Sequence, residues 1–212
     1  MRSTTHVDIQ FMAILFIRHG ETDLNAARVI QMPETPLSAL GVKQAERLGE
    51  RLSTARIGRI LASDYARAHA TAQAVERACG APLTIVPSLR ERHFGDLRGK
   101  SYHELGIDPH AHDYEPPNGE SWSVFHARVA RAWSEVIAQA AGTMGDLAVV
   151  THGLVLRSLV DRIVPSPTDV DPAAVVFHNT SVTVVEGPPW SAVLVGCVTH
   201  LDADLLADGA AA

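Results

Sequence analysis

Short apolar runs alternate along this chain with longer segments in which apolar residues recur every three or four positions. Each run is apolar at successive positions, as expected for a strand buried between two layers of helices. Four such runs occupy residues 12–17, 59–62, 83–86 and 147–150. Two later segments, residues 177–186 and 192–198, are rich in β-branched residues and predict further strands, with a turn at residues 187–189 between them.

The longer segments predict helices. One is capped by Ser38 and extends to Leu52, and the others cover residues 65–78, residues 121–140 and the stretch after Gly153. The apolar face of the first helix is expected to consist of Val42, Ala45, Leu48 and Leu52. Because strands and helices alternate, the predicted fold class is α/β, a three-layer sandwich with a largely parallel central sheet flanked by helices.

Residues 99–120 fit neither pattern and predict a long surface loop or lid. Within this loop, His110 and His112 suggest a pair of metal ligands. No other ligands with suitable spacing accompany them, so a solvated loop is the favoured interpretation. Trp122 and Trp133, in the helix predicted next, suit packing positions better than a platform for substrate.

Composition narrows the class of protein. A chain of 212 residues that is 46% hydrophobic predicts a single domain over residues 1–212, with its core at about residues 13–200. The N-terminal arm and the alanine-rich C-terminal tail are expected to be peripheral. A net charge of -6 argues against a nucleic-acid partner. With two distant cysteines, no secretory signal and no transmembrane stretch, we expect a cytoplasmic protein without a membrane partner.

Two histidines occur in matching positions. His19 and His152 each come at the end of a predicted strand, and a glycine follows each of them. In open α/β sheets, ligands bind outside the carboxyl ends of the strands, where helix N-termini offer free N–H groups to anions. A lone histidine is more often an ordinary, partly buried residue. The shared context of these two favours one site built from distant segments.

Two arginines extend this candidate site. Arg18 precedes His19 at the strand end, where its charge is costly unless it is matched. A phosphate matches it well, because the planar guanidinium binds two oxygens at once. Arg67 follows another predicted strand end and could contribute in the same way. Its alternatives are a solvated charge on a helix face or a salt bridge to Asp64.

Glu91 is the candidate acid. A carboxylic acid beside a phosphate can protonate the leaving oxygen and then activate water. The negative phosphate would also raise the pKa of such a group, as this task requires. The alternative is a surface glutamate paired with Arg90 or Arg92.

Four segments together resemble the motifs of the histidine phosphatase superfamily, also called the phosphoglycerate-mutase-like family. They are Arg18-His19-Gly20-Glu21-Thr22 with Asn25, residues 63–68 around Arg67, Glu91 with Phe94-Gly95, and Thr151-His152-Gly153 with Arg157. They occur in the order typical of the family, and the resemblance spans about residues 13–186. The chain departs from the family pattern near Met32, where a glycine is common.

The resemblance implies a metal-independent phosphatase that hydrolyses small-molecule phosphate monoesters through a phosphohistidine intermediate, without a metal or a cofactor. His19 would be the nucleophile and Glu91 the proton donor. The residues expected to bind substrate are Arg18, Asn25, Arg67, His152 and Gly153. Two arginines and a protonated His152 would supply the positive charge that a metal ion supplies elsewhere.

Two alternatives share these residues. One is a cofactor-dependent phosphoglycerate mutase, but such mutases have a longer covering segment than this chain has between Glu91 and His152. Thr22 after Glu21 also fits the phosphatases. The other is a catalytically inactive module that binds a phosphorylated ligand. The expected partner is a small phosphorylated metabolite selected by residues 99–120, and a homo-oligomer is compatible with the sequence.

Overall fold

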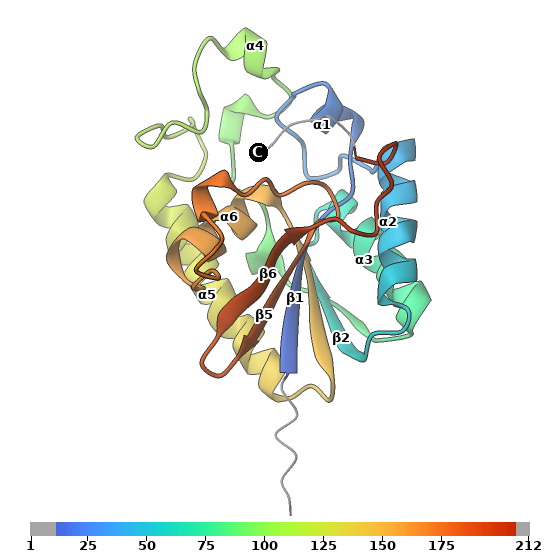
Figure 1. Ribbon diagram of the computed structural model, residues 1–212. Helices are drawn as coiled ribbons and strands as arrows, with labels where there is room; N and C mark the ends of the chain where they lie inside the picture. Colours follow the sequence, from blue (N-terminus) through green and yellow to red (C-terminus); the bar gives the residue numbers. More distant parts are fainter. Residues whose placement is uncertain (1–11, 207–212) are drawn as a thin grey trace, which may run out of the picture.

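A six-stranded mixed sheet forms the middle layer of the structure, a computed structural model that describes residues 12–206 (Figure 1). In spatial order its strands are β3 (Leu83–Ile85), β2 (Ile57–Ala62), β4 (Asp146–Thr151), β1 (Met12–Arg18), β5 (Val182–Gly187) and β6 (Ser191–Cys197). The first four are parallel to one another, whereas β5 pairs antiparallel with β1, and β6 antiparallel with β5. The predicted α/β class with a largely parallel sheet is confirmed.

Helices cover both faces of this sheet. α2 (Ala39–Leu52) and α3 (Ala66–Cys79) cover one face, and α5 (Trp122–Ala141) and α6 (Gly153–Arg162) cover the other (Figure 1). Successive side chains of a strand point to opposite faces. Strand β1 therefore contributes Leu15 and Ile17 to the first core and Ile14 and Phe16 to the second. This double burial explains the continuous apolar runs of the sequence.

Helix α2 begins where the sequence predicts and buries three of the four predicted core residues, Ala45, Leu48 and Leu52. The Ser38 hydroxyl accepts a hydrogen bond from the Gly41 N–H at 3.0 Å, which caps the helix. Val42, however, is 46% exposed, so its predicted core position is wrong. The buried face instead includes Gly41 and Gln44, because α2 packs against the backbone of the loop after β1. Gln44 Oε1 accepts from the Glu21 N–H at 2.8 Å.

The strand predicted over residues 177–186 begins only at Val182, which is a second correction. Residues 177–181 form a loop against the carboxyl end of β1. There the Arg18 guanidinium donates to the Phe177 carbonyl, and the Thr180 N–H donates to the Arg18 carbonyl at 3.0 Å. Of these five residues only Thr180 is β-branched, so little strand propensity opposes the contacts of the loop.

Residues 99–120 lie over the carboxyl ends of the parallel strands, at the same end as α1 (Asp23–Ala26) (Figure 1). They contain the short helix α4 (Tyr102–Leu105). Backbone hydrogen bonds join this segment to the chain after α1: the Tyr102 N–H donates to Arg28 at 2.9 Å, and the Ile30 N–H donates to Lys100 at 3.0 Å. The predicted surface loop is therefore paired with another segment.

Three 3-10 turns complete the fold, at Pro87–Leu89, Gly95–Leu97 and Pro172–Ala174. Within residues 12–206, no helix is both long and apolar enough to cross a membrane. The predicted N-terminal arm and the alanine-rich tail lie outside the described residues.

Candidate active site

The two histidine–glycine corners lie side by side because β1 and β4 are neighbouring parallel strands. Arg18 is paired in register with Thr151, and the His19 N–H donates to the Thr151 carbonyl at 3.0 Å. The ring centroids of His19 and His152 are 5.1 Å apart, and both side chains are almost completely buried. The sheet topology therefore brings two distant segments to one point at its carboxyl edge.

Hydrogen bonding fixes the tautomer of His19. Its Nδ1 lies 2.7 Å from the Gly20 carbonyl oxygen, which can only accept, so Nδ1 carries the proton. Its Nε2 therefore has the lone pair and accepts a hydrogen bond from Arg67 Nε at 3.1 Å. Burial, and after it the charges of Arg67 and Arg18, hold the pKa of His19 well below 6.5. At neutral pH the ring is uncharged, the state that a nucleophilic histidine requires.

His152 is oriented by Ser63, which directly follows β2. The Ser63 hydroxyl lies 2.9 Å from His152 Nε2 and accepts from the Tyr65 N–H at 3.3 Å. The serine proton is free to bond Nε2, which makes Nδ1 an N–H donor. This buried Nδ1 has no hydrogen-bond partner among the residues that the structure describes.

The charge state of His152 is set by its surroundings. Burial, followed by the charges of Arg67, His19 and Arg18, lowers the pKa of His152 well below 6.5. In this structure the ring is therefore neutral at pH 7, whereas the protonated state expected when a phosphoryl group is bound stays a prediction. A neutral Nδ1–H can still donate to an oxygen.

Two buried guanidinium groups lie beside His19. Arg18 donates to a loop carbonyl, and its buried Nε has no partner within residues 12–206. Arg67 donates from Nη1 to the Met32 carbonyl at 3.0 Å. The salt bridge between Arg67 and Asp64 does not form, because Asp64 pairs with Arg90. Burial is the main cause that lowers the pKa of Arg67 to about 10, so it remains charged at neutral pH.

Glu91 reaches the same site from the loop after the first 3-10 turn. Its two carboxyl oxygens accept from the backbone N–H groups of Arg92 at 2.9 Å and Leu154 at 3.0 Å. It is thus not the surface glutamate of the alternative interpretation. Burial, the main influence, raises the pKa of Glu91 above 4.5. A buried carboxyl with a raised pKa is suited to deliver a proton.

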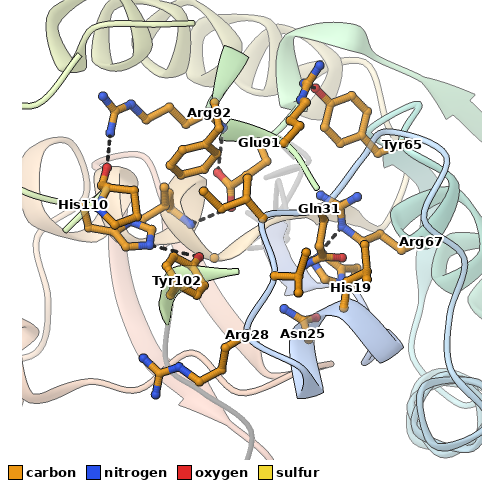
Figure 2. Close-up of a pocket in the computed structure, with 18 of the residues that line it drawn as sticks. His19, Asn25, Arg28, Gln31, Tyr65, Arg67, Glu91, Arg92, Tyr102 and His110 are labelled. Carbon is orange, nitrogen blue, oxygen red and sulfur yellow. Dashed lines mark hydrogen bonds between the residues drawn. The ribbon is translucent and has the colours of Figure 1, made fainter. Parts of the chain in front are cut away.

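These groups surround one cavity of about 290 Å³ (Figure 2). The predicted site residues that line it are Arg18, His19, Asn25, Arg67, Glu91 and Gly153. His152 is the exception: its completely buried ring is not among the lining residues and lies between those of His19, at 5.1 Å, and Tyr65, at 5.2 Å. Asn179 connects two of the lining residues, since its Nδ2 donates to the His19 carbonyl at 2.9 Å and lies 3.5 Å from Asn25 Oδ1.

Residues 99–120 supply the outer wall. Figure 2 shows Tyr102 and His110 across the cavity from His19. His110 Nε2 lies 3.2 Å from the Tyr102 hydroxyl, and His110 lines the cavity. The solvated position predicted for His110 is therefore wrong, whereas His112 is exposed. Within residues 12–206, no group of three His, Cys, Asp or Glu side chains is placed to bind a metal ion.

Arg92 fixes the outer wall in place. Its side chain is 1% exposed, and its guanidinium donates to the carbonyls of Glu120 at 3.0 Å, Pro109 at 3.2 Å and Tyr114 at 2.6 Å. It also lies 3.9 Å from the ring centre of Trp122. Three carbonyls and an aromatic face therefore bind one buried cation, and they order the loop.

Sequence reasoning missed Ser63, Tyr65, Arg92 and Arg98 as parts of this region. The first two directly follow β2, so the strand-end argument that identified Arg67 applies to them as well. Arg92 gives no comparable signal, because its carbonyl partners lie 17 to 28 residues further along the chain. Arg98 lines the cavity from the loop after the second 3-10 turn.

Parallel strands that end in two neighbouring histidines, two buried arginines and a buried carboxyl form a site suited to bind an oxyanion such as phosphate. The chain belongs to the histidine phosphatase superfamily (branch 1), whose family model matches residues 14–198. The resemblance noted in the sequence is confirmed. Members of this superfamily are phosphatases or mutases.

The names of similar proteins include both mutase-like and phosphatase descriptions. The chain is 36% identical over 211 residues to phosphoglycerate mutase-like protein 4 of Arabidopsis thaliana, a match that covers 92% of this chain and 89% of that protein. It resembles the structure of YhfR from Bacillus stearothermophilus with a TM-score of 0.78 and 29% identity, covering 90% of this chain and 100% of that one. A mycobacterial glucosyl-3-phosphoglycerate phosphatase has a TM-score of 0.75 and 25% identity, covering 89% and 100%.

Proposed function

We propose that this chain is a metal-independent phosphatase that hydrolyses small-molecule phosphate monoesters through a phosphohistidine at His19 Nε2. The state of the His19 ring carries this proposal. Gly20 binds the proton on Nδ1, the ring is neutral, and the lone pair of Nε2 faces the Arg67 guanidinium. A phosphoryl group bound by Arg67 and Arg18 would place its phosphorus in front of that lone pair.

In the first step, Arg67 Nε transfers its hydrogen bond from His19 Nε2 to a phosphoryl oxygen. The freed lone pair of Nε2 attacks the phosphorus, and the bond to the leaving oxygen breaks. Glu91, protonated at the start, transfers its proton to that oxygen, so the alcohol leaves neutral. Charge on the equatorial oxygens is stabilised by Arg18 and Arg67, assisted by the unpartnered Nδ1–H of His152. The products of this step are the free alcohol, phosphohistidine and ionised Glu91.

In the second step, water attacks the phosphorus of the phosphohistidine and the P–N bond breaks. The Glu91 carboxylate takes a proton from the water, which restores its protonated form and releases phosphate. The lone pair returns to His19 Nε2. Arg28 lines the cavity and is exposed, so water has access to the site. The short segment between Glu91 and His152 favours hydrolysis over a mutase reaction, in which a longer segment covers the phosphoenzyme.

Phosphate release from p-nitrophenyl phosphate and from alkyl phosphates, measured in excess EDTA, tests the proposal. Turnover should continue in EDTA and disappear in His19→Ala. His69→Ala is the matched control, because His69 lies on α3 away from the cavity, and it should keep wild-type activity. Activity that depends on added metal would contradict the metal-free mechanism. Isomerisation of phosphoglycerate that requires 2,3-bisphosphoglycerate would instead identify a mutase.

A further inference from the structure

The cavity holds more positive charge than a phosphoryl group needs. Arg98 lines it together with Arg18 and Arg67 and is half-buried. Arg98 forms no ion pair with a carboxylate of the described residues. Its charge and that of Arg18 both act to lower the pKa of Arg67, although burial is the larger cause. Two further arginines line the cavity, but Arg92 is bound by three backbone carbonyls and Arg28 is exposed. Arg98 is therefore the half-buried guanidinium that remains beside Arg18 and Arg67.

The contacts of Arg98 are with neutral groups. Its Nη2 donates to the Tyr65 hydroxyl at 2.6 Å, and its Nη1 lies 3.1 Å from His93 Nε2. The other ring nitrogen of His93, Nδ1, accepts from the Gly95 N–H at 3.0 Å. Burial and the charge of Arg98 lower the pKa of His93, which keeps the ring neutral.

A neutral imidazole has only one acceptor nitrogen, yet both nitrogens of His93 face donors. Either the Gly95 N–H or Arg98 Nη1 therefore lacks a true acceptor. A nearby oxyanion would correct this, because guanidinium binds carboxylate and phosphate through charge-assisted hydrogen bonds. The guanidinium of Arg90 also lies over the Tyr65 ring, but it has an acceptor because it forms a salt bridge with Asp64.

The space beyond the phosphoryl position belongs to the leaving group. Its wall is formed mainly by apolar and aromatic residues, including Phe94, Ile107 and Pro109. Asp108, an acid in this outer wall, is exposed, and its Oδ1 accepts from the His110 N–H at 2.9 Å. Arg98 lines the same cavity as these outer-wall residues and as Arg18 and Arg67.

We propose that Arg98 recognises a second anionic group, a carboxylate or a phosphate, on the alcohol portion of the substrate. This inference rests on the proposed phosphatase function and names its substrate class: phosphate monoesters whose leaving group is itself an anion. Arg18 and Arg67 bind the transferred phosphoryl group, and Arg98 binds the other end.

Two matched pairs of esters test this assignment. 3-Phosphoglycerate and glycerol 3-phosphate differ by a carboxylate, whereas propane-1,3-diol bisphosphate and its monophosphate differ by a phosphate. In at least one pair, the wild type should have the higher kcat/KM for the ester that carries the second anionic group. The pair that shows this preference identifies the anion. Arg98→Gln should lower kcat/KM for the preferred ester of that pair by roughly 10- to 100-fold, as expected for a lost hydrogen bond to a charged group. For the ester whose leaving group is uncharged, Arg98→Gln should change kcat/KM by no more than about 3-fold.

Arg90→Gln is the matched control, because it also removes a positive charge from the Tyr65 ring. Arg90 does not line the cavity, so this variant should leave kcat/KM unchanged for both members of each pair. Equal losses on both members of a pair in Arg98→Gln would overturn the proposal, since Arg98 would then bind the phosphoryl group or brace Tyr65. No preference in the wild type, or the same loss in Arg90→Gln, would also overturn it.

A binding measurement separates this proposal from the proposed function. Calorimetric titration of His19→Ala and of the double variant His19→Ala/Arg98→Gln measures binding of the esters without turnover. The double variant should bind the ester with the second anionic group more weakly, and the other ester equally well. If the wild type hydrolyses none of the four esters but this contrast remains, the phosphatase proposal fails and the assignment of Arg98 stands. If the contrast is absent there, the assignment fails. Circular dichroism melts establish that each variant is folded.

Discussion

At the scale of single residues, the structure separates two buried groups that have opposite protonation tasks. His19 must be neutral to attack, and burial together with two arginines keeps its pKa low. Glu91 must be protonated to act as an acid, and burial keeps its pKa high. Loss of solvent disfavours the charged form of both groups, so one physical cause prepares the nucleophile and the acid together.

Glu91→Gln should distinguish acid catalysis from simple positioning. An alkyl phosphate expels a strongly basic alkoxide that needs a proton, whereas p-nitrophenyl phosphate expels a stable phenolate. General acid assistance contributes about 10²- to 10⁴-fold where it is needed. Rapid-quench measurement of the first step should therefore show a large loss on the alkyl ester and a small loss on the aryl ester. Equal losses on both would exclude Glu91 as the acid.

The pH dependence of that step follows from the raised pKa of Glu91. The acid form is lost as pH rises through this pKa, so the first-step rate on an alkyl ester should fall in that range. The fall should be absent in Glu91→Gln, which cannot ionise there.

At the scale of elements, the loop of residues 99–120 depends on one side chain outside it. The Arg92 guanidinium donates to three carbonyls of this loop, those of Pro109, Tyr114 and Glu120. The start of the loop is also hydrogen-bonded to residues 28–30, which follow α1. The sequence predicted a loop in this position because the apolar periodicity stops. It could not predict the order of the loop, because that order comes from tertiary hydrogen bonds with no local pattern.

Arg92→Met should loosen this loop. Methionine keeps apolar contact with Trp122 but leaves three carbonyls without their donor, and we expect a loss of about 2–4 kcal/mol in the free energy of unfolding. Hydrogen exchange should rise in residues 107–120 more than in the strands. The control is Arg131→Met on α5, which is exposed and should change neither measurement. Unchanged exchange in Arg92→Met would show that the loop is ordered by other contacts.

At the scale of the whole molecule, the sequence predicts the features that follow from apolar periodicity and from the position of ligand sites at the carboxyl ends of parallel strands. The strands, the long helices and the meeting of His19 with His152 follow from apolar runs and parallel topology. The failures occur where polar backbone contacts replace apolar packing, as at Val42 and in residues 177–181. We propose that residues 1–212 form a single domain of this family, with the site on one edge of its sheet.

The buried histidines should make the stability of the whole fold sensitive to acid. The folded-state pKa values of His19 and His152 are lowered well below 6.5, and burial with the charge of Arg51 lowers that of His200 to about 4. Below about pH 6.5 the unfolded chain therefore binds more protons than the folded one, so stability falls as pH falls toward 4. Each completely buried histidine contributes a slope of at most about 1.4 kcal/mol per pH unit. Urea unfolding at pH 7.5, 6.5 and 5.5 measures this, and a flat profile would contradict the neutral buried rings.

If His19 carries the phosphoryl group during turnover, the phosphorylated protein can be trapped and the modified residue identified. Rapid-quench mixing with p-nitrophenyl phosphate, followed by alkaline digestion and mass spectrometry, locates phosphate on the chain within the first turnover. We predict phosphate on His19, stable in alkali, labile in acid and absent from His19→Ala. A burst of nitrophenolate without protein-bound phosphate, or phosphate on another residue, would contradict the account.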